Sequence, residues 1–253
     1  MIAILLCAGF GTRMYPLTQD RPKSLLPVAG RPALDYLINQ LLPLEGLSAV
    51  HVVTNGRFHD QFKQWVQQSK PRFKEKGIAL QLHDDGVRSN DERLGANGDL
   101  AFVLNRVGIP DRALLAAGDN ILAFDLEPIW DSFRASGRNT VIALVEKDRE
   151  NLQRTGVLEL GPDERVVGFH EKPADPPSQW FCPPLYFLNR EALERARPFL
   201  AQPEQPDAMG HLIDYLIDKV PIYAYKVSGA RLDIGSLDSY READRIMRQE
   251  TTG

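Results

Sequence analysis

Apolar and polar positions in the first half of the chain alternate between strand-like and helix-like patterns. Ile2 to Leu6 is a continuous apolar run, which is typical of a strand buried on both faces of a parallel sheet. Apolar residues on one stripe of Pro32 to Leu44 predict a helix. The same order predicts strands at 49–54, 78–82 and 113–117 and helices at 58–68 and 99–107. This alternation indicates an α/β fold with an open, mostly parallel sheet and helices on both faces.

The pattern changes from about residue 139. Short strand-like runs separated by turn residues predict antiparallel additions to the sheet at 140–145, 156–160 and 166–170. The segment from Pro173 to Pro184 contains five prolines and is expected to be mostly loop or edge strand. Further strands are expected at 185–188 and 222–227, with helices at 191–200, 209–219 and 236–248. We find no repeat and no long linker, so a single domain over 1–253 is expected.

Charge and cysteine content exclude several classes of protein. The 30 basic and 34 acidic residues give a formal net charge of −4, which argues against a nucleic-acid partner. Cys7 and Cys182 are far apart and belong to no CxxC or His-rich pattern, so neither a disulfide framework nor a zinc site is expected. The apolar start of the chain lacks a basic region and is interrupted at Gly9, which predicts no signal peptide, no membrane span and a cytoplasmic location.

Candidate chemistry begins at the turn after the first strand. Gly9 and Gly11 place bare backbone N–H groups at the carboxyl end of the sheet, where such a turn can bind phosphate. The dinucleotide-binding fingerprint requires a third glycine where Met14 stands, and the Gly-Lys-Ser/Thr of a P-loop is missing. These departures disfavour both a dinucleotide oxidoreductase and a P-loop enzyme.

Two cations ten residues apart, Arg13 and Lys23, follow the glycines. Residues 1–31 contain four basic residues and one acidic residue, Asp20, so this segment carries a local charge of +3 within an acidic chain. Arginine supplies a planar fork of donors and lysine a point charge, and both stabilise charge on phosphates. The loop therefore suits a triphosphate.

These residues carry a family resemblance. Gly9-Phe10-Gly11-Thr12-Arg13, followed by Arg21-Pro22-Lys23, resembles the signature of the sugar-1-phosphate nucleotidyltransferases. Further matches follow in order as Leu-Ala-Ala-Gly-Asp-Asn at 115–120, Glu-Lys-Pro at 171–173 and Leu-Asp-Ile-Gly-Ser at 232–236. The resemblance implies a three-layer α/β/α Rossmann-like nucleotidyltransferase fold. It also implies a nucleotide-binding half at about 1–118 and a sugar-phosphate-binding half at about 119–253.

The reaction implied by the resemblance joins a nucleoside triphosphate to a sugar 1-phosphate and releases pyrophosphate. The attacking sugar phosphate is already ionised at neutral pH, so no general base is required. Catalysis then depends on in-line positioning and on screening of charge by cations and Mg²⁺. The sequence accordingly contains neither a Gly-x-Ser-x-Gly elbow nor a His-Glu-x-x-His motif.

The resemblance also assigns residues to roles. It implies that Arg13 and Lys23 are catalytic cations and that Asp119 and Asp233 bind Mg²⁺. It implies that Glu171 accepts hydrogen bonds from the sugar hydroxyls, that Lys172 holds the phosphate of the sugar, and that Asn120 also belongs to the sugar-phosphate site. The implied nucleotide contacts are Leu6, Ala8, Gly9, Gly11, Thr12, Arg13, Lys23, Gly95 and Asp119. Without the resemblance, Asp119 fits the N-cap of a helix over 121–134, and Asp233 fits an ordinary turn.

Base and sugar identity are open from sequence. The loop at 84–100 is longer and more charged than in relatives and lacks the Gln expected there, although Gly95 matches the loop glycine. The Gly-Asp-Asn triplet at 118–120 favours dTTP or UTP, and glucose 1-phosphate is the expected sugar, although Cys182-Pro183-Pro184 departs from the usual small residue and glycine. A mannose-1-phosphate guanylyltransferase, a phosphocholine cytidylyltransferase and a non-catalytic regulatory module are the alternatives. Homo-oligomerisation is open, and a second, acyltransferase domain is not expected.

Overall fold

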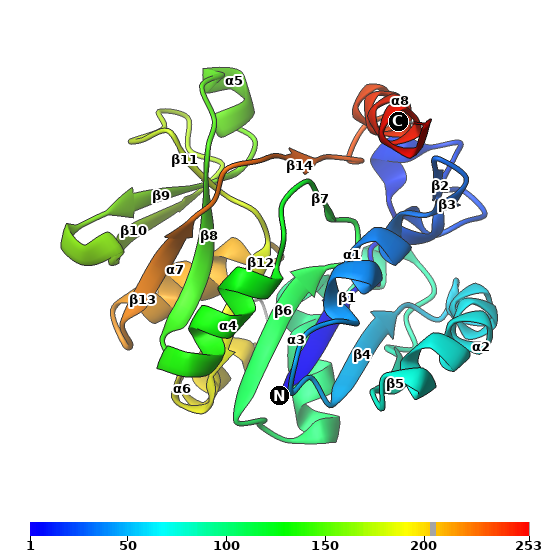
Figure 1. The fold of residues 1–253 in the computed structure, drawn as a ribbon, viewed down its shortest axis with the longest axis horizontal. Coiled ribbons are helices and arrows are strands. Elements are labelled where there is room, and N and C mark those ends of the chain that lie inside the picture. The colour runs from blue at the N-terminus through cyan, green and yellow to red at the C-terminus, as the bar shows by residue number, and fades with distance from the viewer. Residues whose placement is uncertain (203–205, 253) are drawn as a thin grey trace.

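One large mixed sheet organises the molecule. The computed structural model describes residues 1–202 and 206–252. Figure 1 shows the sheet as a twisted layer that runs through the molecule. The strand order in the described part is β10-β9-β11-β8-β12-β6-β1-β4-β5, with β13 also paired to β8. These strands are β1 (Ile2–Leu6), β4 (Ala49–Thr54), β5 (Ala79–Asp84), β6 (Arg112–Ala117), β8 (Asn139–Val145), β9 (Gly156–Leu160), β10 (Val166–Glu171), β11 (Trp180–Cys182), β12 (Leu185–Asn189) and β13 (Ile222–Lys226).

The N-terminal strands form the parallel part of the sheet. β1 lies between β4 and β6, β5 extends the sheet beyond β4, and all three pairings are parallel. Leu6 at the end of β1 is in register with Val53 and Ala117. The loops that follow these strands therefore leave the sheet at one edge, where open α/β folds bind ligands.

The later strands are mainly antiparallel additions, as the sequence predicts. β12 pairs with both β6 and β8 in antiparallel fashion, and β9 lies between β10 and β11. The proline-rich segment is mostly loop, as expected, but its one strand, β11, is not an edge strand, because it pairs with both β8 and β9. Its three residues, Trp180 to Cys182, lie between the prolines, so every residue of the strand retains the N–H that an interior position requires.

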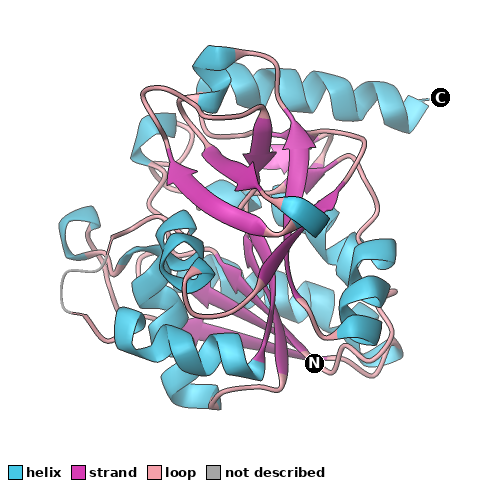
Figure 2. Cartoon of the chain, turned by 90° about the vertical axis from the view of Figure 1, so that its left-hand side faces the viewer, coloured by secondary structure: helices cyan, strands magenta, loops and turns pink. Residues whose placement is uncertain are grey.

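Helices cover both faces of the sheet. The side chains of β1 alternate, so that Ile4 and Leu6 pack on one face while Ala3 and Leu5 pack on the other. The first face is covered by α3 (Gly95–Val107), α6 (Arg190–Leu200) and α7 (Gly210–Ile217), and the second by α1 (Ala33–Leu41), α2 (His59–Glu75) and α4 (Glu127–Ser136). Figures 1 and 2 show the three layers from two directions. The predicted α/β/α layering is confirmed.

The last helix belongs to neither layer. α8 (Leu237–Thr252) packs against the short ribbon of β2 (Pro27–Val28) and β3 (Arg31–Pro32), where Ile234 and Ala243 share a small apolar cluster with Val28. Tyr240 donates its hydroxyl to the Pro27 carbonyl at 2.7 Å. The end of the described chain is thereby held beside the segment that follows the glycine-rich loop, as Figure 1 shows.

Two local expectations differ from the structure. The segment after Asp119 forms the short strand β7 (Ile121–Leu122), which pairs with β14 (Arg231–Leu232), and α4 starts only at Glu127. Asp119 is therefore not a helix N-cap. The short helix α5 (Arg149–Leu152) lies between β8 and β9 and was not expected. Among the described helices, none is both long and apolar enough to cross a membrane.

Candidate active site

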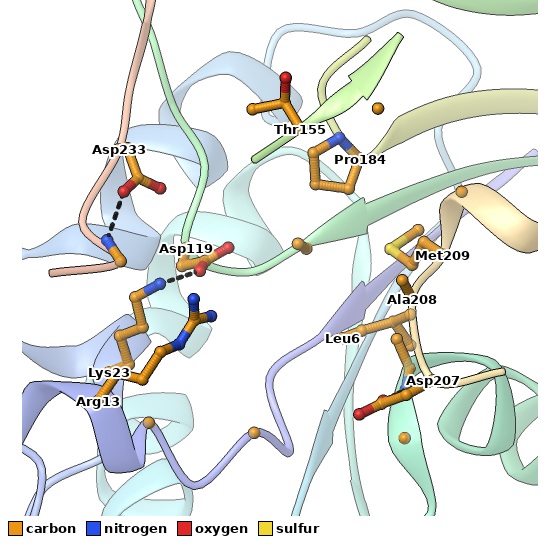
Figure 3. Close-up of a pocket in the computed structure, with 18 of the residues that line it drawn as sticks. Leu6, Arg13, Lys23, Asp119, Thr155, Pro184, Asp207, Ala208, Met209 and Asp233 are labelled. Carbon is orange, nitrogen blue, oxygen red and sulfur yellow. Dashed lines mark hydrogen bonds and ion pairs between the residues drawn. The ribbon is translucent and has the colours of Figure 1, made fainter. Parts of the chain in front are cut away.

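A cleft of about 1200 Å³ opens at the carboxyl edge of the parallel strands. Its lining comes from both ends of the chain and from both parts of the sheet (Figure 3). All residues assigned from the sequence except Asn120 line it, namely Leu6, Ala8, Gly9, Gly11, Thr12, Arg13, Lys23, Gly95, Asp119, Glu171, Lys172 and Asp233. The structure thus brings together residues separated by more than two hundred positions.

The glycine-rich loop is shaped by the backbone conformation of Gly11. This residue has a φ of 63°, in the left-handed region that favours glycine. Thr18 donates its hydroxyl to the Gly11 carbonyl at 2.7 Å, and a Cβ on Gly11 would lie 3.2 Å from a Thr18 carbon. Met14, which occupies the place of the third glycine in dinucleotide-binding loops, is buried. The loop is therefore a compact turn whose following residue, Arg13, is exposed.

Asp119 and Lys23 form an ion pair at the centre of the cleft. The Lys23 ammonium lies 2.5 Å from Asp119 Oδ2, and both side chains are largely buried. Burial raises the pKa of the Asp119 carboxyl, but the charges of Lys23 and Arg231 outweigh that effect and hold the pKa at about 2. Figure 3 shows Arg13 and Lys23 extending towards this carboxylate. Asp119 is therefore ionised at any physiological pH.

Arg231 is a component of the site that the sequence analysis missed. Its side chain is only 12% exposed, donates through Nε to Asn120 Oδ1 at 2.9 Å and through Nη2 to Asp233 Oδ1 at 2.7 Å. Asn120 is fully buried and also donates to the Pro184 carbonyl. Arg231 therefore ties the segment after β6 to the Asp233 turn. Its position just before the Leu-Asp-Ile-Gly motif is the feature of the sequence that could have indicated a role for Arg231 in the site. The sugar-phosphate contact assigned to Asn120 stays a prediction.

Asp233 is held in place by hydrogen bonds, although its side chain is 45% exposed. Its Oδ2 atom accepts hydrogen bonds from the Gly235 N–H at 2.8 Å and from the Ser239 hydroxyl at 3.1 Å. The described residues contain no group of three metal-binding side chains. Mg²⁺ commonly binds through only one or two carboxylates, with phosphates and water completing its shell. Asp119 and Asp233 on one cleft fit that requirement.

Glu171, the last residue of β10, and Lys172 also line the cleft. Their charged groups are 3.6 Å apart, with Glu171 largely buried and Lys172 exposed. Lys172 adopts a φ of 50° and donates its N–H to the Thr155 carbonyl at 2.9 Å. A Cβ on Gly210, the first residue of α7, would collide with Glu171 Oε2. Glycine at this position therefore allows the Glu171 carboxylate to lie against the start of α7.

A second acidic group, Asp85 and Asp99, lines the cleft and has no counterpart in the sequence analysis. Asp85 follows β5, and Asp99 lies in the second turn of α3 with 5% of its surface exposed. Burial raises the pKa of Asp99 to about 8, with further contributions from the charge and hydrogen bond of Asp85 and from Asp207. Burial likewise raises the pKa of Asp85. The pair shares a proton at neutral pH, with Asp99 as the donor.

The raised pKa of Asp99 predicts a specific dependence of stability on pH. Between the ordinary value of 3.8 and about 8, the folded chain holds a proton that the unfolded chain has lost. The free energy of unfolding therefore falls as pH rises through this window. We expect Asp99→Asn, which cannot ionise, to be more stable than the parent chain by at least about 1 kcal/mol at pH 8, and by less at pH 5. Urea unfolding at both pH values measures the difference, which should be absent in Asp91→Asn.

Comparison with known proteins identifies the family. Residues 2–250 match the family model described as Nucleotidyl transferase. The chain belongs to the nucleotidyl transferase family. The resemblance found in the glycine-rich loop and in the later motifs is thereby confirmed, and this nucleotidyl transferase is an enzyme of that class.

Curated relatives of this nucleotidyl transferase act on sugar 1-phosphates, according to their names. The chain is 29% identical to UTP–glucose-1-phosphate uridylyltransferase AglF of Haloferax volcanii, across all of this chain and 98% of the relative. It is 30% identical to glucose-1-phosphate thymidylyltransferase of Neisseria meningitidis, across 84% of this chain and 68% of the relative. A glucose-1-phosphate adenylyltransferase of Vibrio cholerae is 24% identical across 98% of this chain and 66% of the relative.

Solved structures confirm the fold of the nucleotidyl transferase. A UDP-glucose pyrophosphorylase in complex with UDP-glucose superposes with a TM-score of 0.80 at 17% identity, covering 98% of each chain. A UTP-bound UGPase from Acinetobacter baumannii superposes with a TM-score of 0.76 at 20% identity, covering 98% of this chain and 93% of the other. The three-layer nucleotidyltransferase architecture is therefore shared over nearly the whole length.

Proposed function

We propose that this nucleotidyl transferase condenses a nucleoside triphosphate with a sugar 1-phosphate to give a nucleotide sugar and pyrophosphate. The observation that carries the proposal is the Lys23–Asp119 pair beside Arg13, on a cleft that Lys172 also lines. Two separate cationic positions suit two phosphate-bearing substrates. Glucose 1-phosphate is the proposed sugar, since three relatives are named for it.

Different residues of the cleft bind the two substrates. The N–H groups of the loop at 9–12, together with Arg13 and Lys23, bind the triphosphate and stabilise the charge on the departing pyrophosphate. Lys172 holds the sugar phosphate, and Glu171 accepts hydrogen bonds from sugar hydroxyls. The chain is thus divided into a nucleotide-binding half at about 1–118 and a sugar-phosphate half at about 119–253.

The chemical step requires little proton transfer. An oxygen of the sugar phosphate attacks the α-phosphorus, the bond from that phosphorus to the β-phosphate bridge breaks, and pyrophosphate leaves with the electron pair. Asp119 and Asp233 would hold Mg²⁺, which supplies charge screening for the phosphates when bound. Because Arg231 and Ser239 hold Asp233, this carboxylate is positioned before substrate arrives. The cytoplasm, where both substrate classes are available, is the proposed compartment.

A pyrophosphate-release assay tests the proposed function. Purified protein with Mg²⁺ is expected to release pyrophosphate from one nucleoside triphosphate only when a sugar 1-phosphate is also present, and to form the corresponding nucleotide sugar. Each of the five nucleoside triphosphates ATP, GTP, CTP, UTP and dTTP is combined with glucose, mannose or N-acetylglucosamine 1-phosphate. Each nucleotide without a sugar phosphate serves as the control. An absence of coupled release with every pairing would contradict the proposal. A binding-only module would give that result while still retaining nucleotide affinity.

A further inference from the structure

Strand β5 ends the large sheet and leaves a row of backbone groups without a neighbouring strand. It lies beside β4 at the end of the sheet opposite to β9 and β10 (Figure 1). The Ala79 N–H donates to the Ser48 carbonyl at 2.9 Å, so Ala79 and every second residue after it face β4. The peptide groups of Leu80 and Leu82 therefore point away from the sheet. Within the described residues, no strand pairs with this side of β5.

The free edge of β5 lacks the features that commonly prevent an edge strand from pairing with another chain. Such strands are often short, or they carry a bulge, a proline or a lysine. β5 keeps an uninterrupted register with β4 over its six residues and contains neither proline nor lysine. At the other end of the sheet, by contrast, the register of β10 shifts between Val166 and Gly168, as in a β-bulge. Of these two ends of the sheet, β5 is the one open to a further strand.

An apolar hollow lies beside the start of β5. A cavity of about 690 Å³ opens between the end of α2 and this strand, and its lining includes Phe73, Ile78 and Leu80, with Lys70 and Lys74. Phe73 and Ile78 are buried, whereas Leu80 is partly exposed at the edge. A strand added to β5 would remove more of Leu80 from water while it pairs the backbone groups. Both effects favour the addition of a strand.

The charges at the two ends of β5 are opposite. The segment before the strand, 70–76, contains four basic residues and one acidic residue. The segment that begins at the last residue of the strand, 84–92, contains four acidic residues and one basic residue, while 77–83 contains no Lys, Arg, Asp or Glu. Antiparallel pairing of two β5 strands brings the basic end of each copy beside the acidic end of the other. Parallel pairing would bring like charges together, which destabilises a strand pair.

We propose that β5 pairs in antiparallel fashion with β5 of a second copy of this chain, so that one continuous sheet runs through a two-fold symmetric dimer. A two-fold interface joins the same patch of both subunits, so the patch must be complementary to itself. The edge of β5 meets this requirement, because an uncharged centre separates a basic end from an acidic end. A partner with charge of one sign would match only one of these ends. The dimer does not depend on the proposed reaction.

Analytical ultracentrifugation of the intact chain tests whether this dimer forms. The mass of one chain is 28.4 kDa, and the protein is expected to sediment with twice that mass and to dissociate on dilution. A chain that remains monomeric up to about 100 μM would overturn the proposal, because its self-association would then be weaker than that of ordinary specific complexes.

Substitution of Gln81 tests whether the dimer uses this edge. The Gln81 side chain is exposed near the middle of β5, so antiparallel two-fold pairing brings the two copies of residue 81 close together. Gln81→Arg and Gln81→Glu should each weaken the dimer at least about tenfold, because like charges then meet across the axis. An equimolar mixture of the two variants should associate again, because opposite charges meet.

The matched control for these variants is Gln179→Arg, at an exposed residue in the segment before β11, and it should associate as the parent chain does. Circular dichroism checks that all three variants are folded. A dimer that neither Gln81 variant weakens would use another surface and would overturn the proposal. Variants that dissociate but do not reassociate when mixed would contradict the antiparallel pairing.

Hydrogen exchange provides a second measurement on the unaltered chain. The amides of Leu80 and Leu82 should exchange more slowly at concentrations where the dimer forms than after dilution, because the partner strand then accepts their hydrogen bonds. The corresponding amides of Gln81→Arg should exchange rapidly at both concentrations. Equal exchange of Leu80 and Leu82 in the dimeric and the diluted parent chain would contradict the pairing.

Discussion

Replacing Arg13 with alanine is expected to lower kcat by at least about 100-fold without changing the temperature of unfolding. Arg13 is exposed and lines the cleft, and within the part of the chain that the structure describes it makes no hydrogen bond or ion pair. Removal of this side chain should therefore change the free energy of unfolding little. In the proposed transition state, by contrast, the guanidinium would meet charge developing on the departing phosphates, where one such interaction contributes about 100- to 1000-fold.

Steady-state pyrophosphate release measures this effect, and Arg21→Ala provides the matched control. Arg21 is an exposed cation of the same segment that does not line the cleft, so its loss changes the net charge equally. Arg13→Lys should recover part of the lost rate, because it restores the charge but not the planar fork. Turnover by Arg13→Ala within tenfold of the parent chain would show that the catalytic role is misassigned.

Removal of the Asp233 carboxylate is expected to have an effect of similar size. Asp233→Ala should lower kcat/KM by about two orders of magnitude or more and should raise the Mg²⁺ concentration needed for half-maximal turnover. The carboxylate is one of the two that we propose to hold Mg²⁺, and it also accepts hydrogen bonds from Arg231 and Ser239. Its loss therefore removes charge and also releases two neighbours from their positions.

The control for Asp233 is Asp238→Ala, in the first turn of α8. Asp238 is almost fully exposed and makes one surface pair with Arg241, so its removal should leave turnover and the Mg²⁺ dependence unchanged. Circular dichroism on both variants checks that α8 is retained. If Asp233→Ala lost activity with an unaltered Mg²⁺ requirement, Asp233 would be a positioning residue rather than a metal ligand.

Elements bounded by local signals were predictable from the sequence. The strands at Ala49–Thr54 and Gly156–Leu160 match their predicted bounds, because each is an apolar run ended by turn residues. The start of α3 was placed four residues too late. Gly95 and Gly98 resemble a loop in composition, but the helix starts at Gly95, where Asp207 accepts from the Ala96 N–H. Because that contact joins residues 111 positions apart, no local sequence pattern indicates it.

The candidate site likewise contains some residues that local motifs identify and others that only tertiary contacts identify. Residues within the recognisable motifs, such as Lys23 and Asp119, could be assigned from the sequence alone, and the fold brings them to 2.5 Å of each other. Arg231 and Asp99 could not be assigned, because each acquires its significance from distant neighbours. Arg231 bonds to Asn120 across 111 positions, and the environment of Asp99 depends on its burial in the second turn of α3 and on Asp85. Tertiary partners, rather than residue type, define these two positions.

The packing of α8 against β2 makes the N-terminal segment depend on residues that are synthesised much later. The Ala29 N–H donates to Asp244 and Tyr240 donates to Pro27, so the first thirty residues are completed by residues made more than two hundred positions later. A nascent chain that ends at residue 230 already contains the glycine-rich loop, but it lacks Asp233 and the helix that packs against residues 27–29. We therefore expect a nascent chain that ends before residue 233 to be inactive towards the nucleotide pool, although its glycine-rich loop has already been made.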